Sequence, residues 1–436
     1  MKINNLKMKD FIFDYIYMIC ALIYIIGMPV ITLYLWNAKA YYPDDIASVT
    51  NKFSLVLAAL VFVVFIADMF IRKKIRDLLK KRKVIIIFLL FIIWCTISTF
   101  LSSDFDKSFY GVSFRYSGLI QYISYISFAI IGFSLTEKTR NLFFRIFVFI
   151  SLIIGLLTLF RNEISFIKLP VSYDFCGIFF NINHYGYYIL YTTIISMFLF
   201  FEDRNIILKV VDVLVYSFFV YILILNNTFG CYIALFFFLL VLFIYLFKKK
   251  RKILYVFVIV PFIILSIFTK IDGSFAVREN VYELLDDIND IINAPKAKAP
   301  IDSYDNPVVY VGTFRGALWI HGAKYSVKKP FFGYGLENLA QKYMKDNIPM
   351  DMPHNLLLQL ALTVGFPGMI LYIAGLLIVL ISGLKRIKIQ NHLTNLCFFL
   401  IIAHLVSAMF GVTLYYVTSY FIIFLGMAIR WMRGNA

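Results

Sequence analysis

Two arginines and a histidine lie at or shortly before the starts of long apolar stretches. Arg115 lies in FRYSGL, Arg315 lies in TFRGALW, and His354 precedes Asn355 in MDMPHN. A guanidinium is a planar, permanently charged fork that suits phosphate, and a histidine titrates near neutral pH and can act as a general base. These residue types predict an anion site with a proton acceptor. The alternatives are an interface arginine that reaches lipid headgroups and a histidine that only caps a helix.

Polar residues also open two of the predicted helices. Asn181, Asn183 and His184 form the start of NINHYGYY, where they either cap the helix or bind sugar hydroxyls. Asp351 is the expected N-cap of the later helix, with Pro353 in its first turn. His354 and Asn355 would then lie at the positive end of that helix, where free N–H groups favour an anion.

The segment 313–335 combines a short helix with a turn. Helical spacing of i, i+4 and i+7 places three side chains on one face, whereas His321 lies off it: Arg315, Trp319 and Gly322. Gly333 and Gly335 permit a tight turn after Pro330.

Asp104 and Asp106 form the pair most suggestive of a metal site. Two carboxylates alone hold a divalent ion weakly, and a solvated turn accounts for them equally well. The five cysteines contain no CxxC pair, so a zinc site or a disulfide framework is not expected. We expect neither a metal nor a cofactor.

The elements that position these residues are predicted to be membrane helices. Hydrophobic residues make up 61% of the 436, charged residues only 15%, and a spanning helix needs ~20 apolar residues. The fold class predicted is an all-α polytopic membrane protein with about 12 transmembrane helices. The expected spans are 11–35, 53–71, 84–101, 117–135, 142–160, 184–201, 206–225, 229–247, 253–269, 355–382, 395–410 and 417–430.

The distribution of lysine and arginine predicts the topology. Basic segments such as 72–83 and 248–252 alternate with weakly basic ones, so the positive-inside rule places both termini in the cytoplasm. The net charge of +17 then reflects topology and lipid contacts rather than nucleic acid. Three regions follow: nine helices in 1–269, a large, partly helical extracytoplasmic loop in 270–353, and three helices in 354–436. Within the loop we expect a helix from about Leu336 to Lys345.

Taken together, the motifs resemble those of the O-antigen ligase and polymerase family of membrane glycosyltransferases. The features that carry the resemblance, in chain order, are Arg115-Tyr116-Ser117-Gly118-Leu119, Asn181-Ile182-Asn183-His184, Arg315 with Trp319, Pro330 to Gly335, His354-Asn355 and Gly365-Phe366-Pro367-Gly368. The resemblance covers roughly 100–370. It departs where the family has Ser-Arg-Gly, because this chain has Asn226-Asn227-Thr228-Phe229-Gly230 without the arginine.

The resemblance implies a GT-C-like fold and a metal-independent, inverting transfer in a bacterial inner membrane. The donor would be an oligosaccharide on a polyprenyl (undecaprenyl) diphosphate and the acceptor a growing polysaccharide, with a flippase and a chain-length regulator left open as partners. His354 would be the base and Arg315 a catalytic clamp. Arg115, Asn355, Asn183, His184 and Tyr334 would bind substrate. Polymerase is preferred, ligase-type transfer is the alternative, and a lipid-linked oligosaccharide flippase is the rival from another class.

Overall fold

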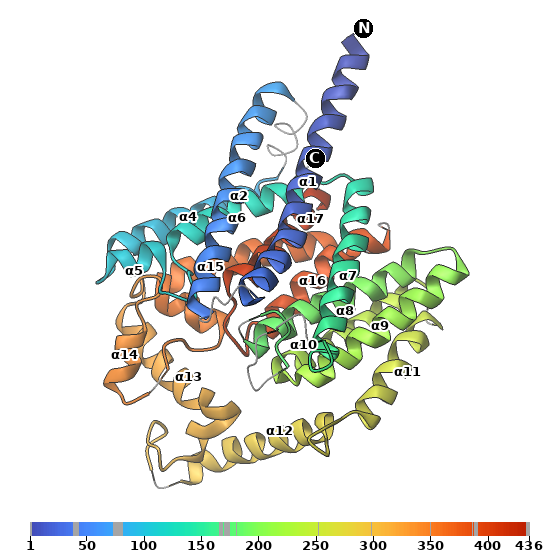
Figure 1. Ribbon diagram of the computed structural model, residues 1–436. Helices are drawn as coiled ribbons and strands as arrows, with labels where there is room; N and C mark the ends of the chain where they lie inside the picture. Colours follow the sequence, from blue (N-terminus) through green and yellow to red (C-terminus); the bar gives the residue numbers. More distant parts are fainter. Residues whose placement is uncertain are drawn as a thin grey trace.

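The chain folds almost entirely into α-helices, as Figure 1 shows. The computed structural model describes residues 2–37, 43–72, 82–164, 169, 175–179, 181–251, 253–297, 299–348, 350–385, 387 and 391–432. Most of the basic segment 72–83, and Lys252 of the segment 248–252, lie outside these residues. The all-α class predicted from the sequence is confirmed for the described part of the chain.

Each of the twelve predicted spans coincides with a helix. These are α1 (Lys2–Asn37), α2 (Pro43–Ile71), α4 (Val84–Phe100), α6 (Leu119–Ser134), α7 (Glu137–Leu159), α8 (Ile182–Glu202), α9 (Ile206–Asn226), α10 (Phe229–Lys248), α11 (Ile253–Phe268), α15 (Leu356–Leu384), α16 (His392–Ser407) and α17 (Tyr415–Trp431). Within the described residues, six are long and apolar enough to cross a membrane: α1, α2, α7, α9, α10 and α15. These helices are those of a multi-pass membrane protein, and the count of twelve spans stays a prediction.

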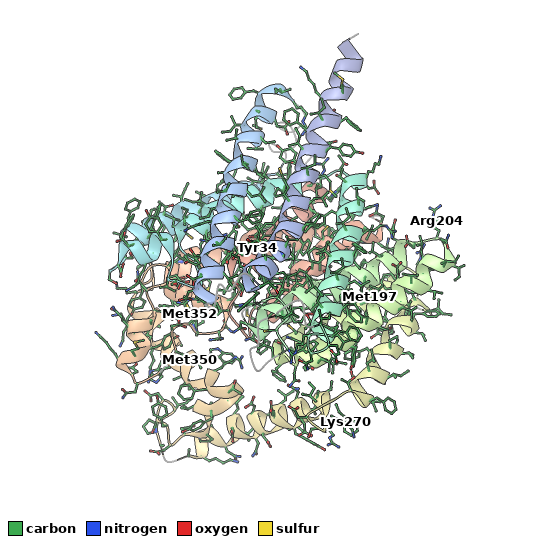
Figure 2. All side chains as sticks on the ribbon, viewed as in Figure 1. Tyr34, Met197, Arg204, Lys270, Met350 and Met352 are labelled. Carbon is green, nitrogen blue, oxygen red and sulfur yellow. The ribbon has the colours of Figure 1, made fainter. Side chains whose placement is uncertain are left out.

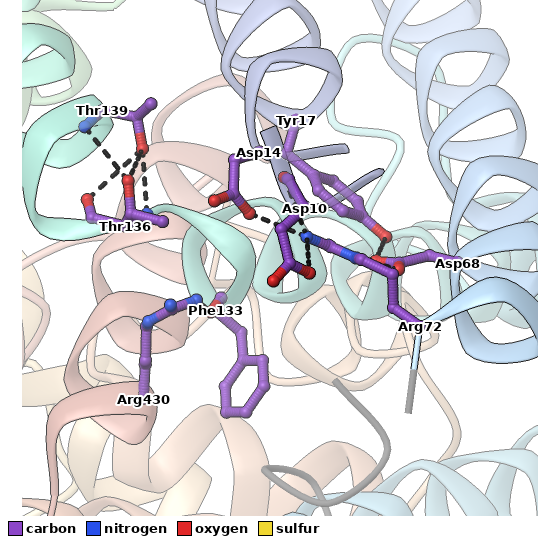
Figure 3. Close-up of polar contacts among 9 residues, drawn as sticks. All are labelled: Asp10, Asp14, Tyr17, Asp68, Arg72, Phe133, Thr136, Thr139 and Arg430. Atoms are coloured by element: carbon purple, nitrogen blue, oxygen red, sulfur yellow. Dashed lines mark hydrogen bonds and ion pairs between the residues drawn. The ribbon is translucent and has the colours of Figure 1, made fainter. Parts of the chain in front are cut away.

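Charged residues gather where α1 begins and α17 ends, and Figure 3 shows this end of the bundle. The Arg72 guanidinium contacts Asp68 and lies 2.9 Å from Asp14 of α1. Arg430 of α17 donates to the carbonyl of Phe133 at 2.7 Å, close to the end of α6. The start of α1 and the ends of α2, α6 and α17 therefore lie together, as alternating helices require.

The opposite ends of the helices meet in the same way. Thr50 of α2 and Tyr415 of α17 share a hydrogen bond of 2.6 Å, and Leu356 N donates to Ala408 O at 2.9 Å. Figure 2 labels Lys270, just beyond α11, and Arg204, between α8 and α9, at opposite ends of the neighbouring helices. We call the end that carries Lys270 the loop end.

The loop end carries the longest connection between spans. After α11 come the two-residue strands β1 (Lys270–Ile271) and β2 (Ser274–Phe275), which pair antiparallel. The remaining elements are α12 (Ala276–Asn293), the 3-10 turns η1 (Ala294–Lys296) and η2 (Pro307–Tyr310), α13 (Val311–Lys328) and α14 (Ala340–Lys345). α14 begins four residues later than predicted, because Leu336 and Glu337 form a turn and Leu336 is buried in the core of the bundle. A short helix, α5 (Phe105–Tyr110), lies between α4 and α6.

Helix α15 is broken at Gly365, which has φ 75° and ψ 172° inside the helix. The break frees carbonyl groups, and the turn after Pro330 binds them: Tyr334 N donates to Leu362 O at 2.8 Å and Gly335 N donates to Thr363 O at 3.0 Å. Backbone groups inside a membrane need partners, and here the loop supplies them. The two glycine motifs that are 30 residues apart in sequence are thus one structural unit, which we call the α15 break.

Candidate functional site

His354 stands two residues before α15 rather than inside it. Its φ of 49° is left-handed, and Asn355 follows in an extended conformation and caps the helix by accepting from Leu358 N at 3.0 Å. The prediction that Asp351 is the N-cap and that Pro353 lies in the first turn is therefore wrong. Asn355 takes the cap because it is the last residue before the chain becomes helical, and the left-handed His354 interrupts the helix before it.

The start of α15 offers fewer free N–H groups than expected. Leu356 N donates to Ala408 O, and Leu358 N is capped by Asn355. The Asn355 side chain also donates to Met409 O at 3.2 Å. The helix N-terminus therefore joins α15 to the end of α16, and a bound anion depends on side chains instead.

Arg115 lies between two carboxylates. It makes two bonds to one oxygen of Glu337, at 2.9 and 2.6 Å, and contacts Asp351 through its other terminal nitrogen. Glu337 is only 3% exposed, and its second oxygen has no partner among the described residues. Burial raises the pKa of Glu337, and the Arg115 charge opposes that rise. Sequence reasoning missed Glu337, because no local pattern distinguishes it from a surface glutamate.

We expect Arg115→Met to destabilise the protein strongly, because it leaves the Glu337 carboxylate buried without its cation. Breaking such a pair costs about 3–5 kcal/mol. The double variant Arg115→Met/Glu337→Gln should recover much of the loss, whereas Arg278→Met, at an exposed ion pair, should change little. Thermal unfolding in detergent measures all three. Equal stability of Arg115→Met and the parent would contradict a buried pair.

Arg315 is held by an unusual backbone turn. Gly312, Thr313 and Phe314 all have φ between 55° and 73°, a left-handed run at the start of α13. One terminal nitrogen of Arg315 donates to Gly312 O at 2.7 Å and to Thr313 Oγ1 at 3.0 Å. Its Nε is buried with no hydrogen-bond partner, and the described residues place no carboxylate within ion-pair distance. Strained backbone and an unsatisfied cation in one place are typical of a functional site.

Arg315 and Arg115 both lie close enough to His354 to change its pKa electrostatically. Burial is the main cause that lowers the pKa of His354, the charges of Arg315 and Arg115 add to it, Asp351 opposes them, and the net result is a pKa of about 4. The His354 ring is therefore neutral at pH 7, and its Nδ1 is buried without a partner. A pKa near neutral was expected from the residue type, and the desolvated, cationic surroundings explain the difference.

The pH dependence of the reaction should reveal this low pKa. A base whose pKa is lowered stays deprotonated as the pH falls below 6.5, and it becomes protonated and inactive only near pH 4. We therefore expect kcat/KM to hold steady from pH 7 down to pH 5.5 before it falls. The measurement is the initial rate of transfer in buffered proteoliposomes. An acid limb centred near 6.5 would show that His354, if it is the base, is not desolvated in this way.

The face of α13 that carries Arg315, Trp319 and Gly322 packs against the segment that contains His354. Trp319 Nε1 donates to Pro353 O at 2.9 Å, next to His354, so the helix that carries Arg315 also holds the histidine segment. Gly322 lies against Leu358 of α15 and Tyr343 of α14, where a Cβ would approach both to within 3.0 Å. His321, off this face, pairs with Asp346 at 2.8 Å. The sequence spacing thus identified the face that packs on the site.

The remaining predicted residues lie partly in the helix bundle and partly in the loop. His184 is buried in the bundle, where one ring nitrogen contacts the Tyr416 hydroxyl and the other is 3.0 Å from Val412 O. Asn183 is half-buried at the first turn of α8. Tyr334 is buried in the loop and donates to Tyr325 O at 3.3 Å. The sequence analysis did not single out Tyr187. This residue lies close enough to Arg315 to interact with it electrostatically, and its hydroxyl is buried without a partner among the described residues.

The Asp104-Phe105-Asp106 pair has a local structural role. Asp104 is the N-cap of α5, accepts from Lys107 N at 3.1 Å and pairs with the Lys107 side chain at 2.8 Å. No group of three or more metal-ligating side chains occurs among the residues that the structure describes. The metal-independent reaction stays a prediction.

An apolar cavity of about 170 Å³ lies beside the site, between α4, α6, α15 and α17. Its lining includes Ser117 and Leu356, each two residues from Arg115 and His354 respectively. From there it extends towards the other end of the bundle, where Ile85 and Ile429 line it. Aromatic rings form much of its wall: Phe88, Phe91, Tyr122, Tyr125 and Tyr372. The cavity therefore offers an apolar space that ends two residues along the chain from Arg115 and from His354.

The turn that lacks the family arginine is held together by amide side chains. Asn227 has a left-handed φ of 55° and ends α9, and Asn226 donates to Phe175 O and Ile182 O. Asn280 of α12 donates to Asn227 Oδ1 at 2.6 Å. These amides connect backbone segments, so the turn supplies no cation.

Residues 214–373 match the family model described as O-antigen ligase. The match begins in α9 and ends in α15, so it contains the loop, Arg315, Glu337, His354 and the α15 break. A search of the curated proteins found no match. The resemblance drawn from the motifs is confirmed over residues 214–373, where this chain matches the O-antigen ligase family model, whereas the motifs at Arg115 and at Asn181–His184 lie outside the match.

Proposed function

We propose that this protein is a polysaccharide polymerase that joins oligosaccharide units carried on polyprenyl diphosphate at the outer face of the membrane. The observation that carries the proposal is an arginine with an unpartnered Nε whose charge lowers the pKa of a neutral histidine with an unpartnered Nδ1, near one end of an apolar cavity. An anionic headgroup, an attacking hydroxyl and the first isoprene units of the lipid chain are the three parts that such a site accommodates. The same chemistry serves a ligase that uses a different acceptor.

In the proposed reaction, the acceptor hydroxyl attacks the anomeric carbon of the donor. A new C–O bond forms, the bond from that carbon to the diphosphate oxygen breaks, and the configuration inverts. His354 Nδ1 accepts the hydroxyl proton, and Arg315 stabilises the negative charge that grows on the departing lipid diphosphate. Polar groups of Asn355, Asn183 and Tyr187 at the same end of the bundle are candidates for the sugar contacts.

Arg115 takes a different role from the one that the sequence predicted. Its two carboxylate partners already neutralise it, so it is a weaker diphosphate ligand than Arg315. We propose that the Arg115 pair fixes the segment containing Asp351 and thereby sets the position of His354. We likewise propose that His184 and Tyr334 support the walls of the site through the bonds described above.

Purified protein in proteoliposomes tests the proposal. A polymerase should lengthen a lipid diphosphate-linked oligosaccharide with no other acceptor present, and EDTA should not reduce the rate. A ligase would leave this donor unchanged until a second acceptor is added. A flippase would move the donor across the bilayer without changing its length. Loss of chain growth in EDTA with recovery in Mg²⁺ or Mn²⁺ would contradict the metal-independent mechanism.

A further inference from the structure

The loop helix α12 has an apolar stripe that no described residue covers. Six side chains at helical spacing are each 37–58% exposed: Val281, Leu284, Leu285, Ile288, Ile291 and Ile292. Acidic residues occupy the opposite side: Glu279, Glu283, Asp286 and Asp290. A contiguous exposed apolar surface marks a contact with a protein or with lipid. We call these six residues the α12 stripe.

Two hydrogen bonds fix how α12 is rotated. Asn280 donates to Asn227 at the end of α9, and Asp287 accepts from Gly312 N at 3.0 Å. The two residues are seven apart and lie on one side of the helix, which faces the rest of the protein. At 100° per residue, the α12 stripe is centred about a quarter turn from that side. Its exposure is therefore a fixed property of the fold and not a consequence of a loose helix.

The position of α12 indicates which surface covers the stripe. It begins at Ala276, eight residues after α11 ends at Phe268, and Figure 1 shows it extending across the loop end of the bundle. Its bond to Asn227 holds its first turns at the level where α9 ends. A helix at that level, across the ends of spanning helices, lies where the acyl chains meet the headgroups.

Continuity with α11 favours lipid over a protein partner. α11 exposes a row of large apolar side chains along its whole length: Ile253, Val256, Phe257, Val260, Ile263, Ile264, Ile267 and Phe268. The junction between the two helices carries Phe275, with Lys270 at 4.7 Å and Arg278 at 5.1 Å from its ring centre. Aromatic and basic residues of this kind gather at membrane interfaces. The lipid-facing surface of α11 thus continues into the α12 stripe.

We propose that α12 is an interfacial helix, with the α12 stripe in the outer boundary of the bilayer and the acidic face in water. The membrane then fixes the height of α12. Through Asp287 and Gly312 it also fixes the left-handed turn that presents Arg315. The inference rests on the proposed topology and not on the proposed activity, and its test does not use activity.

Tryptophan fluorescence of the full-length protein in nanodiscs of brominated phosphatidylcholine tests the proposal. Ile288→Trp places the probe in the stripe, and the matched control Glu283→Trp places it on the acidic face of the same helix. Both positions are exposed, so the added ring should not disturb the fold. The signal is the emission of each variant minus that of the parent, which has four tryptophans. Leu285→Trp is the second stripe position if the first variant does not fold.

The expected result is a blue-shifted added emission for Ile288→Trp that brominated lipid strongly quenches, with little quenching for Glu283→Trp. An unquenched Ile288→Trp with red emission would mean that the stripe faces water and would overturn the proposal. A blue-shifted but unquenched signal would mean that a second copy of this chain covers it, and would also overturn it. Equal quenching at both positions would exclude the proposed orientation.

Discussion

Replacing Arg315 with lysine is expected to remove most glycan transfer while the protein still folds. The turn holds one terminal nitrogen of Arg315 through Gly312 O and Thr313 Oγ1, and it leaves the buried Nε without a partner. Two parallel N–H groups can hold a diphosphate in one geometry, and a lysine ammonium cannot reproduce that fork. Removing one such stabilising contact typically lowers kcat by about 10²–10³-fold. The measurement is the initial rate of transfer in proteoliposomes.

The matched control is Arg278→Lys, which changes the same side chain in the same loop at an exposed position. Its rate should equal that of the parent, and both variants should keep the parent's thermal unfolding in detergent. A normal rate for Arg315→Lys would remove Arg315 from the mechanism and leave the fold as described. A normal thermal unfolding of Arg315→Lys together with a lost transfer rate would show that Arg315 acts in the chemistry and not in holding the fold.

The second large effect is expected at His354. Loss of a general base typically costs about 10²–10⁴-fold in rate. Asparagine is the suitable replacement, because His354 has a φ of 49° and asparagine adopts this left-handed conformation more readily than alanine. His354→Asn should therefore keep the segment before α15 in place and remove only the basic nitrogen.

His321→Asn is the control, since His321 lies in the same loop but pairs with Asp346. It should keep nearly full activity. If His354→Asn were as active as His321→Asn, another group would have to accept the proton. The buried, unpaired oxygen of Glu337 would then be the next residue to test.

The sequence predicted the helices well, because a membrane helix is encoded by about 20 adjacent residues. The hairpin of α9 and α10 and the placement of Arg315 and His354 in one long connection between α11 and α15 both follow from hydropathy and local motifs. Helix ends were less accurate: at α15, Asp351, Pro353 and Asn355 all carry start signals. Only the backbone conformation shows that Asn355 takes the cap.

The part that the sequence did not predict consists of contacts between distant residues. Arg115 and Glu337 are 222 positions apart, and neither has a neighbour in sequence that suggests the pair. The low pKa of His354 has the same origin, because it arises from burial and from two arginines on other segments. Residue type and spacing identify candidate groups, whereas their ionisation depends on which charges the fold brings beside them.

The α15 break has a consequence for exchanging parts between related proteins. The turn that contains Tyr334 and Gly335 donates to the carbonyls of Leu362 and Thr363, and Phe366 N donates back to Pro330 O at 2.8 Å. A graft of the loop alone would set 330–335 of one parent against 362–366 of the other, and these segments fit only because both carry glycines. A Cβ at Gly333 would collide with the backbone of Leu362 and Thr363, and a Cβ at Gly365 with that of Phe331. A functional chimera must therefore carry 330–335 and 362–366 from the same parent. The natural boundary for recombination lies inside α15, beyond Pro367, and not at the membrane surface.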